Sequence, residues 1–167
     1  MRGREKILRR GRKQSLQIDV LIQSPKWKTE PRAAAIVRKA IRSAVIAAST
    51  PRAELAIVLT NDSAIHALNR DWRGQDKPTN VLSFPAAASA APHLGDVALA
   101  YETCAREAAE QGKALKHHLA HLVAHGVLHL LGWDHQTDAE ADRMEAIERD
   151  ILARIGVPDP YRLPAHG

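Results

Sequence analysis

Three histidines within a short segment constrain this chain more than any other feature of its sequence. His125 and His129 are four residues apart, and His135 follows shortly after Gly132. Residues four apart share one face of a helix, and a glycine can adopt the left-handed conformation that ends a helix and reverses the chain. Neutral imidazole is a good zinc ligand, and catalytic zinc sites usually combine three protein ligands with water. The segment therefore predicts a metal-dependent enzyme.

The spacing of these histidines is also that of the metzincin peptidases, His-Glu-x-x-His-x-x-Gly-x-x-His. Gly126 stands where those peptidases carry the glutamate that acts as general base. A glycine cannot accept a proton, so the metal scaffold matches while the peptidase base is missing. A metallopeptidase-like hydrolase stays as an alternative, as does a structural, non-catalytic metal site in which Cys104 supplies a fourth ligand.

Other polar residues near the motif receive supporting roles. His121 lies one turn before His125, and we expect it in the core or beside a ligand rather than on the metal. Asp134 can hydrogen-bond the second nitrogen of a ligand ring and fix its tautomer, or it can act only as a turn residue. His117 and His118 are expected to face solvent.

Length and composition indicate one globular domain. The chain has 167 residues, of which 45% are hydrophobic, and no apolar run approaches the length of about 20 residues that spans a bilayer. We expect a basic extension over 1–15, a catalytic domain over 16–156 and a tail over 157–167. The net charge of +5 is concentrated in the extension and favours binding to polyanions.

Cys104 is the single cysteine, which fits a reducing compartment and hence the cytoplasm.

Hydrophobic periodicity predicts alternating strands and helices. Alternation of apolar and polar residues, or short apolar runs between turn residues, predicts strands over 16–22, 53–59, 79–84 and 96–100. Helical spacing with cap and stop residues predicts helices over 31–50, 60–71, 101–112, 114–131 and 138–155. This order indicates a small α/β or α+β domain.

Three linear segments resemble the YbeY family, the bacterial metal-dependent endoribonucleases also called rRNA maturation factors. The segment from His125 to His135 is similar to the family signature His-Gly-x-Leu-His-Leu-x-Gly-Tyr-Asp-His, with Trp133 in place of tyrosine. Residues 73–85 resemble its Arg-Gly-x-Asp-Lys-Pro-Thr-Asn-Val-Leu-Ser-Phe-Pro block, and residues 94–97 its Leu-Gly-Asp-Ile strand entry. The resemblance covers roughly residues 16–156.

The resemblance implies a small four-stranded mixed sheet with flanking helices and a zincin-like metal helix. It implies one zinc ion per chain, held by His125, His129 and His135. It also implies cleavage of single-stranded RNA, with a role in maturing the 3′ end of small-subunit ribosomal RNA and in ribosome quality control. The expected partners are ribosomal RNA, the small ribosomal subunit and proteins on the ribosome. Arg73 matches an arginine thought to be important for activity in that family.

Phosphodiester chemistry agrees with these roles, because the charge on the phosphate grows in the transition state. A metal ion and a guanidinium both stabilise such charge, and we expect Arg73 to clamp the phosphate oxygens. Either water at the metal or an RNA 2′-hydroxyl attacks phosphorus. Lys77 lies in the same loop as Arg73 and is a candidate contact to RNA. Thr79, Asn80 and Ser83 either add hydrogen bonds to RNA or pack within their strand.

Overall fold

The computed structural model describes residues 15–162. Its strands are β1 (Ser15–Ile22), β2 (Arg52–Thr60), β3 (Val81–Pro85) and β4 (His93–Ala100). Its helices are η1 (Pro25–Thr29), α2 (Ala33–Ala47), α3 (Asp62–Arg73), η2 (Ala88–Ala90), α4 (Tyr101–Glu110), α5 (Leu115–Leu130) and α6 (Asp138–Ala153). The predicted strands and helices all form, with ends shifted by a few residues, and the short 3-10 helices η1 and η2 are additional.

The predicted basic extension over 1–15 lies outside the described residues except for Ser15, which begins β1. Residues 163–167 of the predicted tail also lie outside them. The first part of that tail belongs to the packed structure, because Val157 is 5% exposed and is part of the main hydrophobic core. Within the described part of the chain, every helix is too short or too polar to cross a lipid bilayer.

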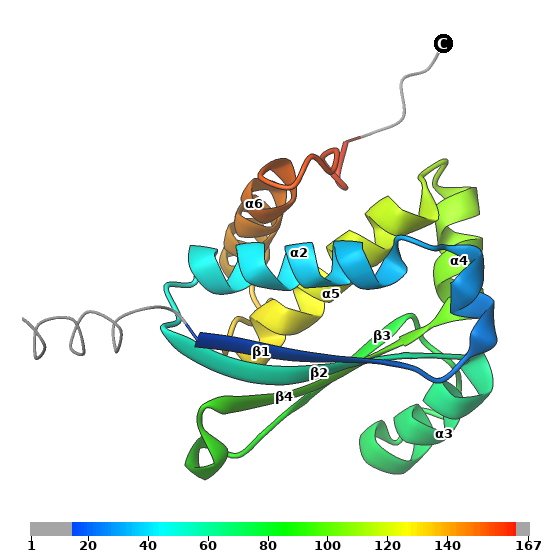
Figure 1. Ribbon diagram of the computed structural model, residues 1–167, viewed down its shortest axis with the longest axis horizontal. Coiled ribbons are helices and arrows are strands. Elements are labelled where there is room, and N and C mark those ends of the chain that lie inside the picture. Colours follow the sequence, from blue (N-terminus) through cyan, green and yellow to red (C-terminus); the bar gives the residue numbers. More distant parts are fainter. Residues whose placement is uncertain (1–14, 163–167) are drawn as a thin grey trace, which may run out of the picture.

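The strands form one mixed sheet in the order β1-β2-β4-β3. β1, β2 and β4 run parallel, and β3 is an antiparallel edge strand beside β4. Helices α2 and α5 cover one face of the sheet, α6 packs against both of them, and α3 lies on the opposite face (Figure 1). The mixed sheet and flanking helices confirm the predicted α+β class.

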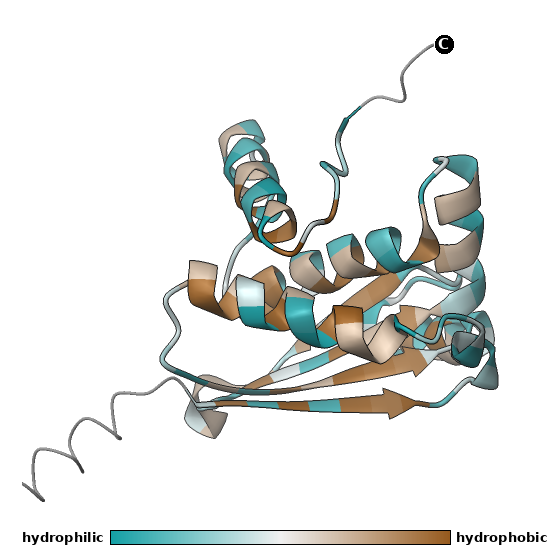
Figure 2. Cartoon of the chain, turned by 45° about the horizontal axis from the view of Figure 1, so that its top comes forward, coloured by the Kyte–Doolittle hydropathy of each residue, from teal (hydrophilic) through white to brown (hydrophobic). Residues whose placement is uncertain are grey.

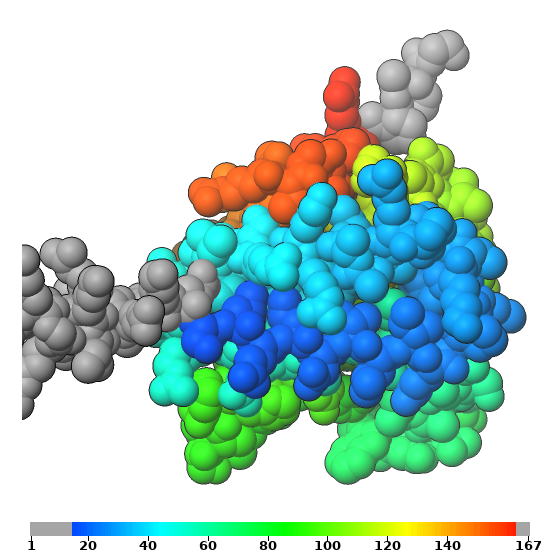
Figure 3. Space-filling view, viewed as in Figure 1, coloured from blue at the N-terminus to red at the C-terminus, as the bar shows by residue number. Residues whose placement is uncertain are grey.

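Alternating side chains hold the sheet against α2 and α5. In β1, Leu16, Ile18 and Val20 pack against the core while the residues between them are exposed, as the two-residue period of a strand requires. Figure 2 shows hydrophobic residues along the strands and mixed faces on the helices. In Figure 3, β1 and α2 lie side by side on the face in view. A hydrogen bond joins the two elements, in which the Arg38 guanidinium donates to the Ile18 carbonyl at 3.0 Å.

A smaller apolar cluster under α3 positions the end of that helix. It consists of Ile65 from α3 together with Leu82, Ala98 and Ala100 from the sheet. The Asn61 side chain caps the helix start by accepting from the amide of Ala64 at 2.8 Å. Gly74, with a φ of 68°, ends the helix directly after Arg73, so Arg73 lies at the end of α3 that leads toward β3.

Helix α5 lies close against the sheet at Gly126. A Cβ at this position would lie 2.8 Å from Val97 Cγ1 and 3.1 Å from Ser83 Oγ, both shorter than ordinary contacts. The Ser83 hydroxyl donates to the Gly126 carbonyl at 3.1 Å, which joins the helix to the edge strand. The absence of a side chain at 126 therefore allows the helix to lie against β3 and β4.

We expect Gly126→Ala to lower the free energy of unfolding by about 1–3 kcal/mol, because the new methyl overlaps the stiff, β-branched Val97. Chemical denaturation would measure the change. The double variant Gly126→Ala/Val97→Ala should lose less stability than the two single variants added together, because truncation of Val97 makes room for the methyl. An alanine variant at least as stable as the wild type would contradict the close contact, since alanine is intrinsically the better helix former.

Candidate metal centre

The three predicted metal ligands lie together in the structure. His125 and His129 are one turn apart on α5, and Gly132, with a φ of 94°, reverses the chain so that His135 returns to them. The Nε2 atoms of His125 and His129 are 3.0 Å apart, and one ring nitrogen from each of the three histidines lies within 4.8 Å of the others. Such a group could hold a metal ion.

Hydrogen bonds to the ring nitrogens of His125 and His129 leave both Nε2 atoms free for a metal. His125 Nδ1 donates to Glu148 Oε1 at 2.6 Å, and His129 Nδ1 donates to the Trp133 carbonyl at 3.0 Å. A carboxylate and a carbonyl only accept, so in the neutral rings each Nε2 carries a lone pair. Two ligands of a tetrahedral zinc ion are about 3.3 Å apart. The facing lone pairs at 3.0 Å therefore fit a shared cation.

The surroundings of His129 favour the form that binds metal. Burial lowers the pKa of His129, and the neighbouring imidazoles of His125 and His135 lower it further. The ring is therefore more readily neutral than an exposed histidine at the same pH. A metal ion needs the neutral imidazole, because a protonated ring has no free lone pair to donate.

Glu148 on α6 is the residue of this site that the sequence analysis missed. Its side chain is fully buried, and its carboxylate accepts hydrogen bonds from His125, from His121 at 3.1 Å and from the Tyr161 hydroxyl. Burial raises the pKa of the Glu148 carboxyl, but these three donors outweigh it and bring the pKa to about 2. One signal was present in the sequence, since Glu148 shares a helical stripe with Met144, and a buried carboxylate requires partners.

Three polar residues near the histidine motif, namely His118, His121 and Asp134, have positions or roles predicted from the sequence, and the structure shows where each one lies. His121 lies beside the metal cluster, where its Nε2 donates to Glu148. The Asp134 carboxylate accepts from the amide of His135 at 2.7 Å, a turn contact, while the ring contact predicted for it is made by the Trp133 carbonyl. The expectation that His118 faces solvent is wrong: it is 4% exposed, and its Nε2 lies 3.0 Å from a carboxylate oxygen of Glu107.

Arg73 and the histidines line the same cavity, whose volume is about 660 Å³. The Arg73 guanidinium donates to the Ser83 carbonyl and lies 5.9 Å from the centre of the Phe84 ring. A guanidinium has five N–H donors, so most of them are left for a ligand. The cavity thus combines three imidazoles from the α5 side with one arginine from the α3 side.

Of the other residues predicted to contact RNA, one lines the cavity and another stabilises the fold. Ser83 lines the cavity, but its hydroxyl is used in the bond to Gly126. Asn80 holds the fold, since its amide donates to Glu107 at 3.0 Å and its side-chain oxygen accepts from the amide of Val81. Lys77, Thr79 and Asn80 are not among the described residues that line this cavity.

Cys104 lies in α4 and is fully buried. Its thiol donates to the Asn80 carbonyl at 3.7 Å, and burial together with the charges of Glu107 and Asp62 raises the pKa of this thiol. The group of metal-binding side chains found in residues 15–162 contains the three histidines and no cysteine. The structure therefore does not support a closed site with Cys104 as fourth ligand.

A family model described as Endoribonuclease YbeY matches residues 19–156. Many curated relatives match this chain, among them three that carry the name Endoribonuclease YbeY. Those of Rhodopseudomonas palustris BisB18 and Bradyrhizobium sp. BTAi1 are 54% and 50% identical, and each match covers 86% of this chain and 90% of the relative. The relative from Nitrobacter winogradskyi is 49% identical, with 87% and 82% covered.

A solved structure shares the fold. The solution structure of TM1509 from Thermotoga maritima matches with a TM-score of 0.54 at 20% sequence identity, covering 87% of this chain and 99% of that one. At this level of identity the likeness concerns the arrangement of strands and helices.

We expect the purified protein to bind one divalent ion, and His129→Ala to lose it, because two imidazoles cannot replace the three-ligand set. Metal content after dialysis, measured by elemental analysis, would show the loss. His93→Ala is the matched control, since this histidine is half-exposed at the start of β4 and should leave the metal content unchanged. Full metal content in His129→Ala would contradict the assignment.

Proposed function

The chain belongs to the endoribonuclease YbeY family, and from this premise we propose that it is a metal-dependent endoribonuclease acting on single-stranded RNA. The observation that carries the proposal is the cavity that Arg73 shares with His125, His129 and His135. A metal site and a guanidinium that line one cavity suit a substrate whose reacting group is an anion.

The ion proposed for this site is zinc, one per chain. Three neutral imidazoles suit zinc, and the free Nε2 atoms of His125 and His129 already face each other. When bound, zinc would lower the pKa of a water ligand and stabilise negative charge on phosphate oxygens. The task of the protein is to hold the three rings in place and to leave one side of the site open to the cavity.

Arg73 is proposed to bind the phosphate oxygens of the scissile bond. Its planar fork can donate two parallel hydrogen bonds to a phosphate, which a lysine cannot reproduce. The Ser83 carbonyl holds the guanidinium, and the Ser83 hydroxyl binds the Gly126 carbonyl next to His125. One residue of β3 thus sets the position of the arginine relative to the metal helix.

Two nucleophiles fit this proposal: water, and the 2′-hydroxyl next to the scissile phosphate. The ends of the RNA fragments distinguish them. Attack by the 2′-hydroxyl leaves a 2′,3′-cyclic phosphate, whereas attack by water leaves a linear phosphate and an intact 2′-hydroxyl.

The geometry at Gly126 counts against the peptidase alternative. A peptidase of this spacing needs a glutamate at position 126, and even a Cβ there would lie 2.8 Å from Val97. The position that carries the base in those peptidases is here used to pack the helix on the sheet.

The finer part of the proposal concerns the substrate. We infer that it is the 3′ end of small-subunit ribosomal RNA in the cytoplasm, bound on the small subunit together with ribosomal proteins. The resemblance of residues 73–85 and 125–135 to the rRNA maturation factors supports this inference, as does the net charge of +5, which favours binding to a polyanion.

We predict that Arg73→Glu retains its metal and loses RNA cleavage by about 100-fold or more, since it replaces a phosphate ligand with a repelling charge. Single-turnover cleavage of a labelled oligoribonucleotide would measure the rate. Arg70→Glu is the matched control, because it makes the same charge change at an exposed position of the same helix. If both variants lose the same activity, overall charge rather than a clamp is responsible.

Assembled ribosomal particles that contain precursor RNA test the substrate. The wild type should shorten the 3′ end of the small-subunit RNA, and Arg73→Glu, prepared in parallel, should not. Sequencing of the 3′ ends would locate the cut. Equal cleavage by both preparations would point to a contaminating nuclease, and cleavage of free oligonucleotides but not of particles would refute the ribosomal part of the proposal.

A further inference from the structure

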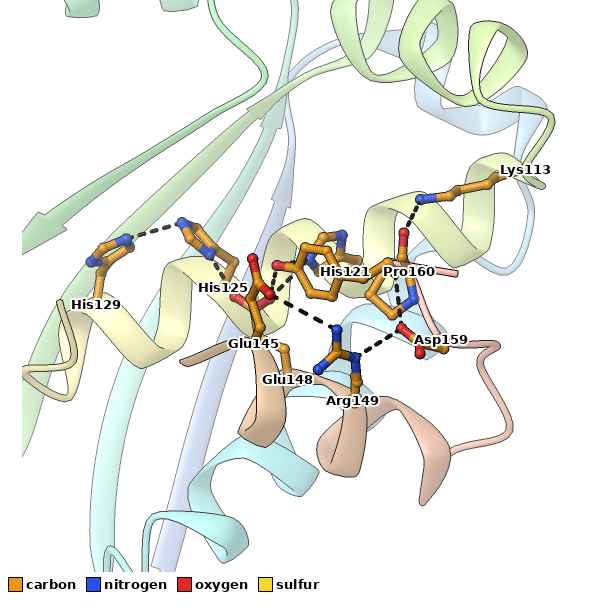
Figure 4. Close-up of polar contacts among 10 residues, drawn as sticks. Lys113, His121, His125, His129, Glu145, Glu148, Arg149, Asp159 and Pro160 are labelled. Atoms are coloured by element: carbon orange, nitrogen blue, oxygen red, sulfur yellow. Dashed lines mark hydrogen bonds and ion pairs between the residues drawn. The ribbon is translucent and has the colours of Figure 1, made fainter. Parts of the chain in front are cut away.

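A buried carboxylate links the metal helix to the chain that follows α6. Glu148 accepts hydrogen bonds from His121 and His125 on α5 and from Tyr161 beyond α6 (Figure 4). Its side chain is fully buried, so bulk solvent does not reach the carboxylate. The three donors together offset the cost of burying a charge at this depth.

The bond from His125 to this carboxylate controls how the ring meets a metal. At 2.6 Å the contact is short, as expected for a charge-assisted bond. It keeps the proton on Nδ1, directs Nε2 toward His129 and prevents rotation of the ring. A carboxylate behind a ligand histidine also makes the ring a stronger electron donor, and such partners commonly change metal affinity by about 10–100-fold.

Tyr161 is itself firmly held. Its ring packs edge-on against His121 with centroids 5.2 Å apart, and the Arg149 guanidinium lies 5.1 Å from its centre. Arg149 also pairs with Asp159 at 3.2 Å. The Lys113 ammonium, in the turn before α5, donates to the Pro160 carbonyl at 2.7 Å (Figure 4). Residues 159–161 are therefore attached to α5 through His121, to α6 through Arg149 and to the turn before α5 through Lys113.

We propose that Glu148, held in place by Tyr161, is a positioning residue that orients His125 and sets the affinity of the site for its divalent ion. The inference rests on the proposed function only in assuming that the three histidines bind a metal. It assigns to Tyr161, in the segment after α6, a part in metal binding that acts through Glu148 rather than on a ligand atom.

The competing explanation is that Glu148 only stabilises the packing of α5 on α6. The two explanations predict different metal affinities for the folded protein. A purely structural carboxylate would change the melting temperature of the metal-free protein and leave the affinity of the folded site unchanged. A positioning carboxylate changes the affinity itself.

The test measures zinc affinity of the full chain by competition with a chromophoric chelator, together with the melting temperature of the metal-free form. Glu148→Gln keeps the shape and removes the charge, and we expect zinc to bind about 10–100-fold more weakly. Asp150→Asn, which removes an exposed carboxylate from the same helix, is the control and should bind like the wild type.

Tyr161→Phe tests whether Tyr161 holds Glu148 in place, because this variant removes one donor to Glu148 and keeps the ring. We expect a smaller loss, of about 3–10-fold, since two donors to the carboxylate remain. Cobalt(II) in place of zinc gives an independent readout: the visible absorption spectrum should shift in Glu148→Gln if the orientation of His125 changes.

Wild-type affinity in a folded Glu148→Gln variant would overturn the proposal. If that variant does not fold, Tyr161→Phe decides: weaker zinc binding supports the proposal, and unchanged binding overturns it. Failure of the proposed function is a separate result, because it would appear as an absence of zinc binding in the wild type, before any variant is compared.

Discussion

The contact between α5 and the sheet at Gly126 is the constraint on which the rest of the site depends. Because this residue has no side chain, the helix lies directly against Val97, and its carbonyl comes within reach of the Ser83 hydroxyl. Ser83 also holds Arg73 through its own carbonyl. The helix that carries His125 and the arginine that lines the same cavity are therefore placed relative to each other by one short set of contacts.

Two different structural elements supply the histidines and the arginine of the site. The candidate metal ligands come from α5 and the turn after it, and Arg73 comes from the end of α3, on the other side of the edge strand. Both elements are anchored to the sheet by apolar contacts. Groups that stabilise a developing charge are most effective when they are fixed beforehand, because no reorganisation is then needed during reaction.

Glu148 shows how a costly residue can be tolerated in a core. An isolated buried carboxylate destabilises a fold, but three donors from α5 and from beyond α6 compensate for its desolvation. The carboxylate connects the packing of the last helix with the orientation of His125. The buried carboxylate thus orients one histidine of the candidate metal centre.

The sequence by itself identified the candidate metal ligands and determined the fold class. The spacing of His125 and His129 equals one helical turn, and a glycine that ends a helix returns His135, so short-range geometry was sufficient. Tertiary structure decided the roles of Ser83, Glu148 and the buried His118, whose partners lie 43, 23 and 11 residues away. Helical and strand periods are local properties that a sequence displays, whereas contacts between elements depend on how whole helices pack, which no local pattern encodes.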